Sequence, residues 1–167
     1  TMSKGAQDTA KASAALSRLS GDVAGAASQS RILADAMSAE AEKMQRAAQS
    51  AQIKADTAER MAVTARNHAN DLKKELENTE DVTDAMKENA SAAVTEAERL
   101  EKSAQAVRKK AADSEKAAKA AQSNAQAALK AAEADEQLFQ SAVKVSSAES
   151  KTADALNKAE EEAKQYG

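Results

Sequence analysis

Apolar residues recur along most of this chain in alternating steps of three and four residues. This spacing places them on one narrow stripe of a helix, as in coiled coils. One extra four-residue step, between Met37 and Ala41, predicts a local phase slip in the supercoil. The first series comprises Leu16, Leu19, Val23, Ala26, Ser30, Leu33, Met37, Ala41, Met44, Ala48, Ala51, Ala55, Ala58, Ala62, Ala65, Ala69, Leu72 and Leu76.

Two further series predict two further helices. The second runs from Val82 to Ala132 and then meets Asp135, an acidic residue where an apolar one is expected. A weaker third series runs from Phe139 to Tyr166 through Ala142, Val145, Ala148, Thr152, Ala155, Ala159 and Ala163. The first break falls at Asn78-Thr79-Glu80-Asp81, where Asn or Thr can cap a helix and the acidic pair suits the positive end of the next dipole. A second break near Ala134-Asp135-Glu136 gives helices over about 7–77, 80–133 and 136–165.

We therefore expect an all-α fold, an elongated antiparallel helical hairpin or bundle of two long helices with a shorter third helix packed along them. All of residues 1–167 form a single extended helical-bundle domain in this interpretation. One unbroken helix would reach roughly 250 Å, whereas Ala at successive stripe positions suits two closely packed helices. Gly21 and Gly25 either weaken the first helix, by about 1 kcal/mol each relative to Ala, or let a neighbouring backbone approach closely.

The composition favours helix in a chain with few large apolar residues. Ala occupies 45 of the 167 positions, there is no Pro or Cys, and Gly occurs four times. Leu, Ile, Val and Phe together fill only 19 positions, a proportion typical of disordered chains. The lack of Pro, the net charge of −3 and the periodic pattern favour a folded helix, with disorder as the alternative. A thick core is excluded because Ala buries little apolar area.

The charged residues predict solvated helix faces. Their near balance gives no strongly basic face for nucleic acid. Six acid-before-base pairs stand four residues apart, a spacing that stabilises isolated helices. They are Glu42–Arg46, Asp56–Arg60, Glu98–Lys102, Glu115–Lys119, Asp154–Lys158 and Glu160–Lys164.

Candidate chemistry is sparse. His68 is the only histidine, and no converging ligands accompany it, so we expect a solvated helix residue and no metal site. The run Glu160–Glu162 and the basic run Arg108–Lys110 have the same interpretation, because neither lies beside a pocket or an aromatic platform. No phosphate loop, nucleophile elbow or zinc-ligand spacing occurs. We expect no enzyme activity, catalytic residue, cofactor, nucleic-acid partner or small-molecule substrate.

Three other residues stand out. Phe139 and Tyr166, the only two aromatic residues, are interpreted as core plugs, with Phe139 locking the third helix onto the other two. Asn89 begins Asn89-Ala90-Ser91, the only N-glycosylation sequon, which matters only in a secreted protein.

The stretches 39–48 (AEAEKMQRAA) and 109–121 (KKAADSEKAAKAA) are similar to the alanine-rich surface coat proteins of African trypanosomes, in particular to the glutamic acid/alanine-rich proteins. The similarity spans nearly the whole chain and rests on composition and helical style. It implies an extracellular, GPI-anchored coat protein built on a helical bundle, similar to the amino-terminal domains of variant surface glycoproteins and to the helical haptoglobin–haemoglobin receptor. No run of 18 apolar residues occurs. We interpret the opening Thr1-Met2-Ser3-Lys4-Gly5 as an engineered junction or an internal start. We expect any signal or lipid anchor to lie outside the chain.

Three functions remain open at this point. The first is a structural cell-surface coat protein, a rigid helical rod that packs densely against neighbouring coat proteins and shields the membrane. The second is a coiled-coil scaffold segment of the laminin-like or cytoskeletal kind, an obligate oligomer through a continuous apolar stripe. The third is a stress-type protein that is disordered in dilute solution and becomes helical on drying or at a membrane.

Overall fold

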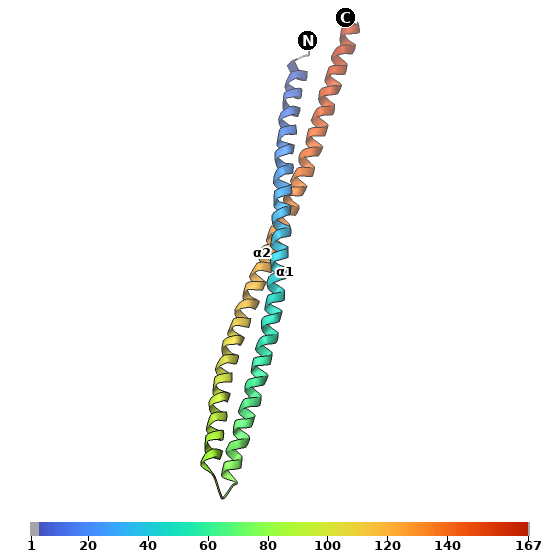
Figure 1. Ribbon diagram of the computed structural model, residues 1–167. Helices are drawn as coiled ribbons and strands as arrows, with labels where there is room; N and C mark the ends of the chain where they lie inside the picture. The colour runs from blue at the N-terminus through green and yellow to red at the C-terminus, as the bar shows by residue number, and fades with distance from the viewer. Residues whose placement is uncertain (1–3, 167) are drawn as a thin grey trace. The chain divides into compact units, whose positions relative to one another are not determined.

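A computed structural model describes residues 4–166, apart from the side chain of Ala6. It contains two α-helices, α1 (Lys4–Glu77) and α2 (Asp84–Tyr166), and no strand within the described residues (Figure 1). The expected all-α fold with two long helices is confirmed. The predicted third helix is wrong, because α2 continues through Ala134-Asp135-Glu136 without a break. Ala, Glu, Lys and Gln dominate both helices, and these residues lose little side-chain freedom in a helix.

The chain divides into two compact units. Unit 1 is formed by residues 1–38 with 123–167, and unit 2 by residues 39–122. Within each unit a segment of α1 lies beside an antiparallel segment of α2 (Figure 1). In unit 2 the two paired segments, 39–77 and 84–122, are each about 58 Å long at 1.5 Å per residue.

The turn of unit 2 occupies residues 78–83. The predicted break is therefore in the right place, although α2 begins four residues later than expected. Thr79 Oγ1 donates to the carbonyl of Glu75 over 2.6 Å at the end of α1. The cap of α2 is Thr83, whose Oγ1 accepts from the N–H of Met86 over 3.2 Å, and Asp84 is the acidic residue of the first turn. Asn78 is therefore not the cap of α2, and Glu80 and Asp81 lie before its first turn and not within it.

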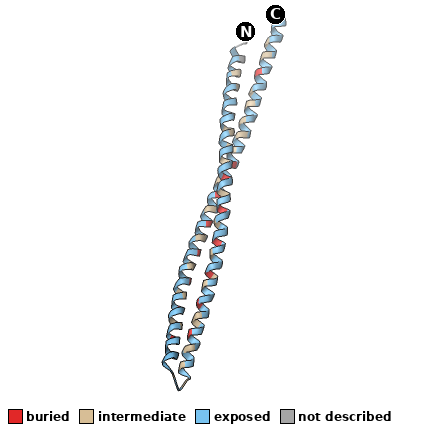
Figure 2. Ribbon diagram, in the orientation of Figure 1, coloured by how far each residue is buried: buried red, intermediate tan, exposed pale blue. Residues whose placement is uncertain are grey.

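The buried core consists of alanine alone among the described residues (Figure 2). On both helices the buried alanines recur every seven residues, and a half-buried residue follows each of them three positions later in most cases. We call these two rows of positions the seam. The buried alanines are Ala34, Ala41, Ala48, Ala55, Ala62 and Ala69 on α1, and Ala90, Ala97, Ala104, Ala111, Ala118, Ala125, Ala132 and Ala153 on α2. A methyl group is small enough for two helices to pack closely along their whole paired length.

The seam of α1 runs without the predicted phase slip. Leu19 and Leu33 are 52% and 58% exposed, although the pattern placed them on the stripe. The seam instead passes through Ser20, Ala27 and Ala34 in unbroken seven-residue steps. The predicted stripe is wrong in this segment because it follows the larger side chains, Leu19 and Leu33, whereas the seam contains the smaller side chains next to them, Ser20 and Ala34.

The carboxyl-terminal part of α2 departs from prediction in the same way. Val145, at 50% exposure, does not lie in the seam, which continues through Phe139, Ser146 and the buried Ala153. Phe139 is half-buried on this seam and locks no third helix. Tyr166 is 91% exposed, so its interpretation as a core plug is wrong.

Gly25 lies in the exposed middle of α1, and no atom comes within 4 Å of a Cβ placed on it; the same holds for Gly21. The suggested close approach of a neighbouring backbone is therefore wrong at both positions.

We expect Gly25→Ala to raise the free energy of unfolding by about 1 kcal/mol, because Ala loses less backbone entropy in a helix. Thermal melting followed by circular dichroism measures this change. An unchanged or lowered melting temperature would show that residue 25 is not helical in solution.

Candidate functional site

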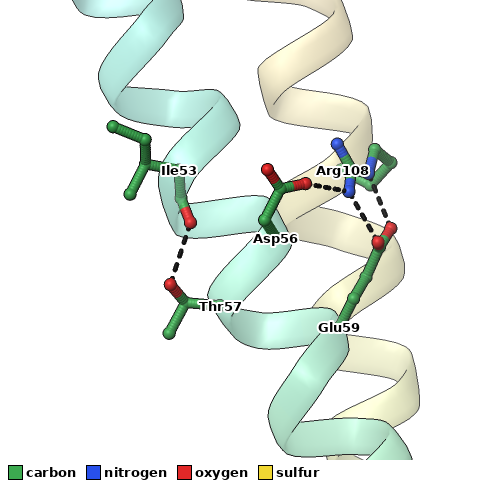
Figure 3. Close-up of polar contacts among 5 residues, drawn as sticks. All are labelled: Ile53, Asp56, Thr57, Glu59 and Arg108. Atoms are coloured by element: carbon green, nitrogen blue, oxygen red, sulfur yellow. Dashed lines mark hydrogen bonds and ion pairs between the residues drawn. The ribbon is translucent and has the colours of Figure 1, made fainter.

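The most strongly organised polar site is a pair of cross-helix ion pairs in unit 2. The Arg66 guanidinium binds the Glu101 carboxylate through two hydrogen bonds of 2.6 and 3.0 Å. Arg108 bridges two acidic residues of α1: its Nε donates to Glu59 over 2.6 Å and its Nη2 to Asp56 over 2.7 Å (Figure 3). Planar guanidinium groups suit such two-point binding of carboxylates.

Heptad position explains why these residues meet. Glu59 and Arg66 each follow a buried seam alanine of α1 by four residues, and Glu101 and Arg108 do the same on α2. This position borders the seam on one side, and in antiparallel coiled coils it faces its equivalent on the partner helix. The two pairs therefore stand seven residues apart with opposite polarity, acid on α1 in one pair and base on α1 in the other.

Hydrogen bonding from arginine lowers the pKa of both glutamates. Arg108 lowers the pKa of Glu59, against a smaller opposing effect of desolvation, and Arg66 does the same for Glu101. The same bonds raise the pKa of Arg66 and Arg108. All four side chains remain partly exposed, between 31% and 48%, so solvent screens these attractions. Their main consequence is geometric rather than energetic.

The ion pairs fix the alignment of the two helices. The residue numbers of the partners add up to 167 in both Arg66–Glu101 and Glu59–Arg108, as expected for one antiparallel alignment. The repeated seam alanines do not distinguish this alignment from one shifted by seven residues. A shift of seven in one direction places Arg66 opposite Arg108, and in the other it places Glu59 opposite Glu101. Like charges then face each other, so the ion pairs select one alignment.

A shallow groove of about 650 Å³ lies between the two ion pairs, on the surface of unit 2. Its floor includes Ala62 and Ala104, and Glu59, Glu101 and Arg108 line its sides. Each of these three charged groups is already bound across the helices, and Lys109 is a fourth charged residue in the lining. The lining contains no His, Cys, Ser or Thr side chain. What this arrangement does is hold two helices together at a set alignment.

Unit 1 has its own polar contact within the seam. Ser30 Oγ of α1 donates a hydrogen bond to the Asp135 carboxylate of α2. This bond explains how an acidic residue occupies a seam position without ending the helix. A break at Asp135 is predicted from the sequence because its hydrogen-bond partner, Ser30, lies 105 residues away and cannot be recognised from neighbouring residues.

The predicted candidate residues do not converge on a site. His68 and Asn89 are both exposed, the first on α1 and the second near the start of α2. Glu160 is half-buried, while Glu161 and Glu162 are exposed. In the basic run only Arg108 differs from the expected solvated patch, since it binds across to α1 while Lys109 and Lys110 are exposed.

Of the six predicted pairs along the helices, two form ion pairs. Lys119 lies 3.0 Å from Glu115 and Lys164 lies 3.7 Å from Glu160. Within the described residues, Asp56 pairs with Arg108 and not with Arg60, and no ion pair joins the other three. Sequence reasoning missed the cross-helix pairs because it considered only neighbours along one helix. The available signal was opposite charges at matching heptad positions.

No three His, Cys, Asp or Glu side chains among residues 4–166 are close enough together to hold a metal ion. Neither helix, over its described length, combines the length and apolar character needed to cross a membrane. Comparisons with family models, curated proteins and solved structures give no match for this chain.

Acid is expected to weaken unit 2. Since the folded-state pKa of Glu59 and Glu101 lies below the ordinary value of 4.5, their contribution to stability is present above that value. It is lost as the pH falls through the lowered pKa values. We expect the melting temperature to drop from pH 5 to pH 2, with a shallower drop in the double variant Glu59→Gln/Glu101→Gln. Equal slopes for variant and parent would contradict the lowered pKa values.

Proposed function

We propose that this chain is a non-enzymatic structural protein of the cell surface, one of a dense layer of coat proteins that shield a membrane. The observation that carries the proposal is the intramolecular use of the seam. In both units the buried alanines of α1 lie against α2 of the same chain. Such a chain stiffens itself by pairing its own two helices and leaves mostly polar faces for solvent and neighbours. Its partners are neighbouring coat proteins.

The scaffold alternative uses the seam differently. An obligate coiled-coil oligomer buries its apolar stripe against other chains, and dimers of that kind favour Leu in the stripe. Here the cross-helix bonds Arg66–Glu101 and Ser30–Asp135 join residues of one chain. This observation supports the self-contained coat protein over the scaffold.

The setting comes from the resemblance to trypanosome coat proteins and includes a lipid anchor outside this chain. Antibodies raised against the protein should label intact, unpermeabilised cells that express its gene. Treatment with phosphatidylinositol-specific phospholipase C should release the antigen into the medium. Labelling only after permeabilisation would refute the surface location, and labelling that resists the enzyme would refute the lipid anchor. An intracellular protein labelled in parallel serves as the permeability control.

Asn89 is the site at which a surface protein of this sequence would carry an N-linked glycan. Its side chain is exposed on α2, while the adjacent Ala90 is buried in the seam. A glycan on Asn89 would therefore extend into solvent. We expect peptide-N-glycosidase to increase the gel mobility of the protein isolated from its cells, with no effect on an Asn89→Gln variant. Identical mobility with and without the enzyme would show that the sequon is not used.

A further inference from the structure

Unit 1 exposes large apolar side chains at one heptad position of both helices. Leu19 and Leu33 of α1, and Leu138 and Val145 of α2, each stand immediately before a seam residue. Their exposed fractions range from 50% to 58%. This position borders the seam on the side opposite the position of the ion pairs, and in an antiparallel pair it faces its equivalent on the other helix. The four side chains therefore lie along one side of unit 1.

The same heptad position is polar in most heptads of unit 2, where it includes Glu40, Lys54 and Glu75 on α1, and Glu96 and Lys110 on α2. The exceptions are Ala47, Ala117 and Met61, which is 54% exposed. Pairing of the two helices does not require an apolar residue at this position, since unit 2 pairs without one in most heptads. The apolar residues of unit 1 need another explanation.

A second row on α2 widens this surface. Residues 127, 131, 134, 138, 141, 145, 148, 152, 155 and 159 follow steps of four and three, the same spacing as the seam, and all are exposed. None is charged; they are Ala127, Ala131, Ala134, Leu138, Ser141, Val145, Ala148, Thr152, Ala155 and Ala159. We call these residues, with Leu19 and Leu33, the apolar face. It contains much of the series that predicted a third helix, so that periodicity is real but belongs to an unpartnered surface.

A row of lysines borders the apolar face on the side away from α1. Lys130, Lys144, Lys151 and Lys158 each stand two residues before a seam position, about 60° around the helix from the alanines of the face. No ion pair engages these four lysines within the described residues. We call them the lysine row. Any partner seated on the apolar face meets positive charge along this border.

We propose that the apolar face of unit 1 binds one amphipathic helix of a partner protein, whose small apolar residues recur in steps of three and four and are bordered by acidic residues. The alanines let a helix pack closely, as they do in the seam. Leu138 and Val145 provide the larger apolar contacts, and the lysine row selects an acidic partner. The ten-position row on α2 is about 48 Å long, enough for about four heptads. The proposal does not depend on a surface location.

Charge disfavours a second copy of the chain as the occupant. Two copies stacked on this face bring the lysine row against either its own equivalent or Lys4, Lys11 and Arg18, which hold the corresponding position on α1. Both arrangements oppose like charges. A lipid surface would need a wider band of bulky apolar residues than the two that α2 presents on this face.

The test measures binding of two fluorescein-labelled helical peptides to the whole chain by fluorescence anisotropy. The acidic probe is four copies of the heptad Ala-Gln-Gln-Leu-Glu-Gln-Glu, and the matched basic probe has Lys in place of both Glu residues. We expect the acidic probe to bind at least about tenfold more tightly than the basic one. The variant Lys144→Glu/Lys151→Glu should abolish this preference, because the two glutamates and the two remaining lysines leave the border without net charge.

Two further variants test the apolar contact. Leu138→Glu/Val145→Glu should abolish binding of the acidic probe, whereas Ile53→Glu, at an exposed position of unit 2, should leave it unchanged. Circular dichroism of each variant confirms that its helix content is that of the parent. Equal binding of both probes, no binding of either, or equal loss from Ile53→Glu would overturn the proposal.

Two other experiments test the other occupants. A doubled mass in analytical ultracentrifugation, reversed by Leu138→Glu/Val145→Glu, would assign the face to a second copy instead. Sedimentation with vesicles of 70% phosphatidylcholine and 30% phosphatidylserine, lost in the same variant, would assign it to a membrane.

Discussion

Substitution of Ala55 by leucine is expected to lower the free energy of unfolding by about 1–3 kcal/mol. Ala55 has no exposed surface and lies in the seam of unit 2, where α1 meets α2. Three additional heavy atoms cannot be placed there without separating the helices or forcing the side chain out of a preferred rotamer. Because neighbouring seam positions also hold alanine, a local separation removes contacts above and below the substituted site. Urea unfolding followed at 222 nm measures the change.

Ala47→Leu provides the matched control. Residue 47 is exposed and stands immediately before the seam residue Ala48, at the border of the seam and not within it. Leucine and alanine have similar helix propensities, so this substitution should leave the unfolding free energy nearly unchanged. If Ala47→Leu and Ala55→Leu destabilise equally, the loss is intrinsic to α1 and the seam does not pass through Ala55.

Reversal of one charge in the Arg66–Glu101 pair should destabilise the protein, and reversal of both should restore it. In the native pair Arg66 Nε lies 2.6 Å from Glu101 Oε1. Arg66→Glu replaces this attraction by two facing carboxylates. Glu101→Arg places two guanidinium groups there. In the double variant the pair re-forms with opposite polarity, so the effects of the two single changes do not add. Thermal melting at low salt gives the coupling between them, which should shrink as salt is added.

Arg60→Glu is the control for this cycle. Arg60 is exposed on the solvent face of the same helix and makes no ion pair within the described residues. Its reversal should change the melting temperature little and should show no coupling to Glu101→Arg. Additive melting temperatures in the Arg66–Glu101 cycle would mean that these residues do not meet in solution.

The two long helices and the turn between them could be predicted because their signals are local. Apolar spacing of three and four continues on both sides of residues 78–81 and pauses there. The course of the seam and the unbroken length of α2 could not be predicted from the size of the apolar side chains alone. Leu19 and Leu33 drew the predicted stripe away from Ser20 and Ala34, although the seam depends on close approach and small side chains suit it better. Asp135 looked like a break because its partner, Ser30, is known only once the two helices are aligned.

The polar site depends on the same missing information. Arg108 stands in a basic run, and Asp56 stands four residues before Arg60, so each had a nearer explanation along its own helix. Their contact requires a specific antiparallel alignment, which the seven-residue alanine repeat leaves undecided. The alignment is set by charges at matching heptad positions. The predicted stripe coincides with the seam from Ala41 to Leu76 and from Val82 to Ala132, so this rule could already have been applied to that part of the sequence.

Disulfide trapping at Ser30 and Asp135 tests most directly whether α1 and α2 pair within one chain at this alignment. The natural sequence has no cysteine, so an introduced pair reacts without competition. The side chains of these residues are in hydrogen-bonding contact, and a disulfide needs such proximity. We predict that Ser30→Cys/Asp135→Cys oxidises rapidly to a monomer of altered gel mobility. The pairs Ser30→Cys/Ala128→Cys and Ser30→Cys/Ala142→Cys, shifted by seven residues in either direction, should remain reduced. Rapid oxidation of a shifted pair, or a disulfide-linked dimer in place of the monomer, would contradict the account.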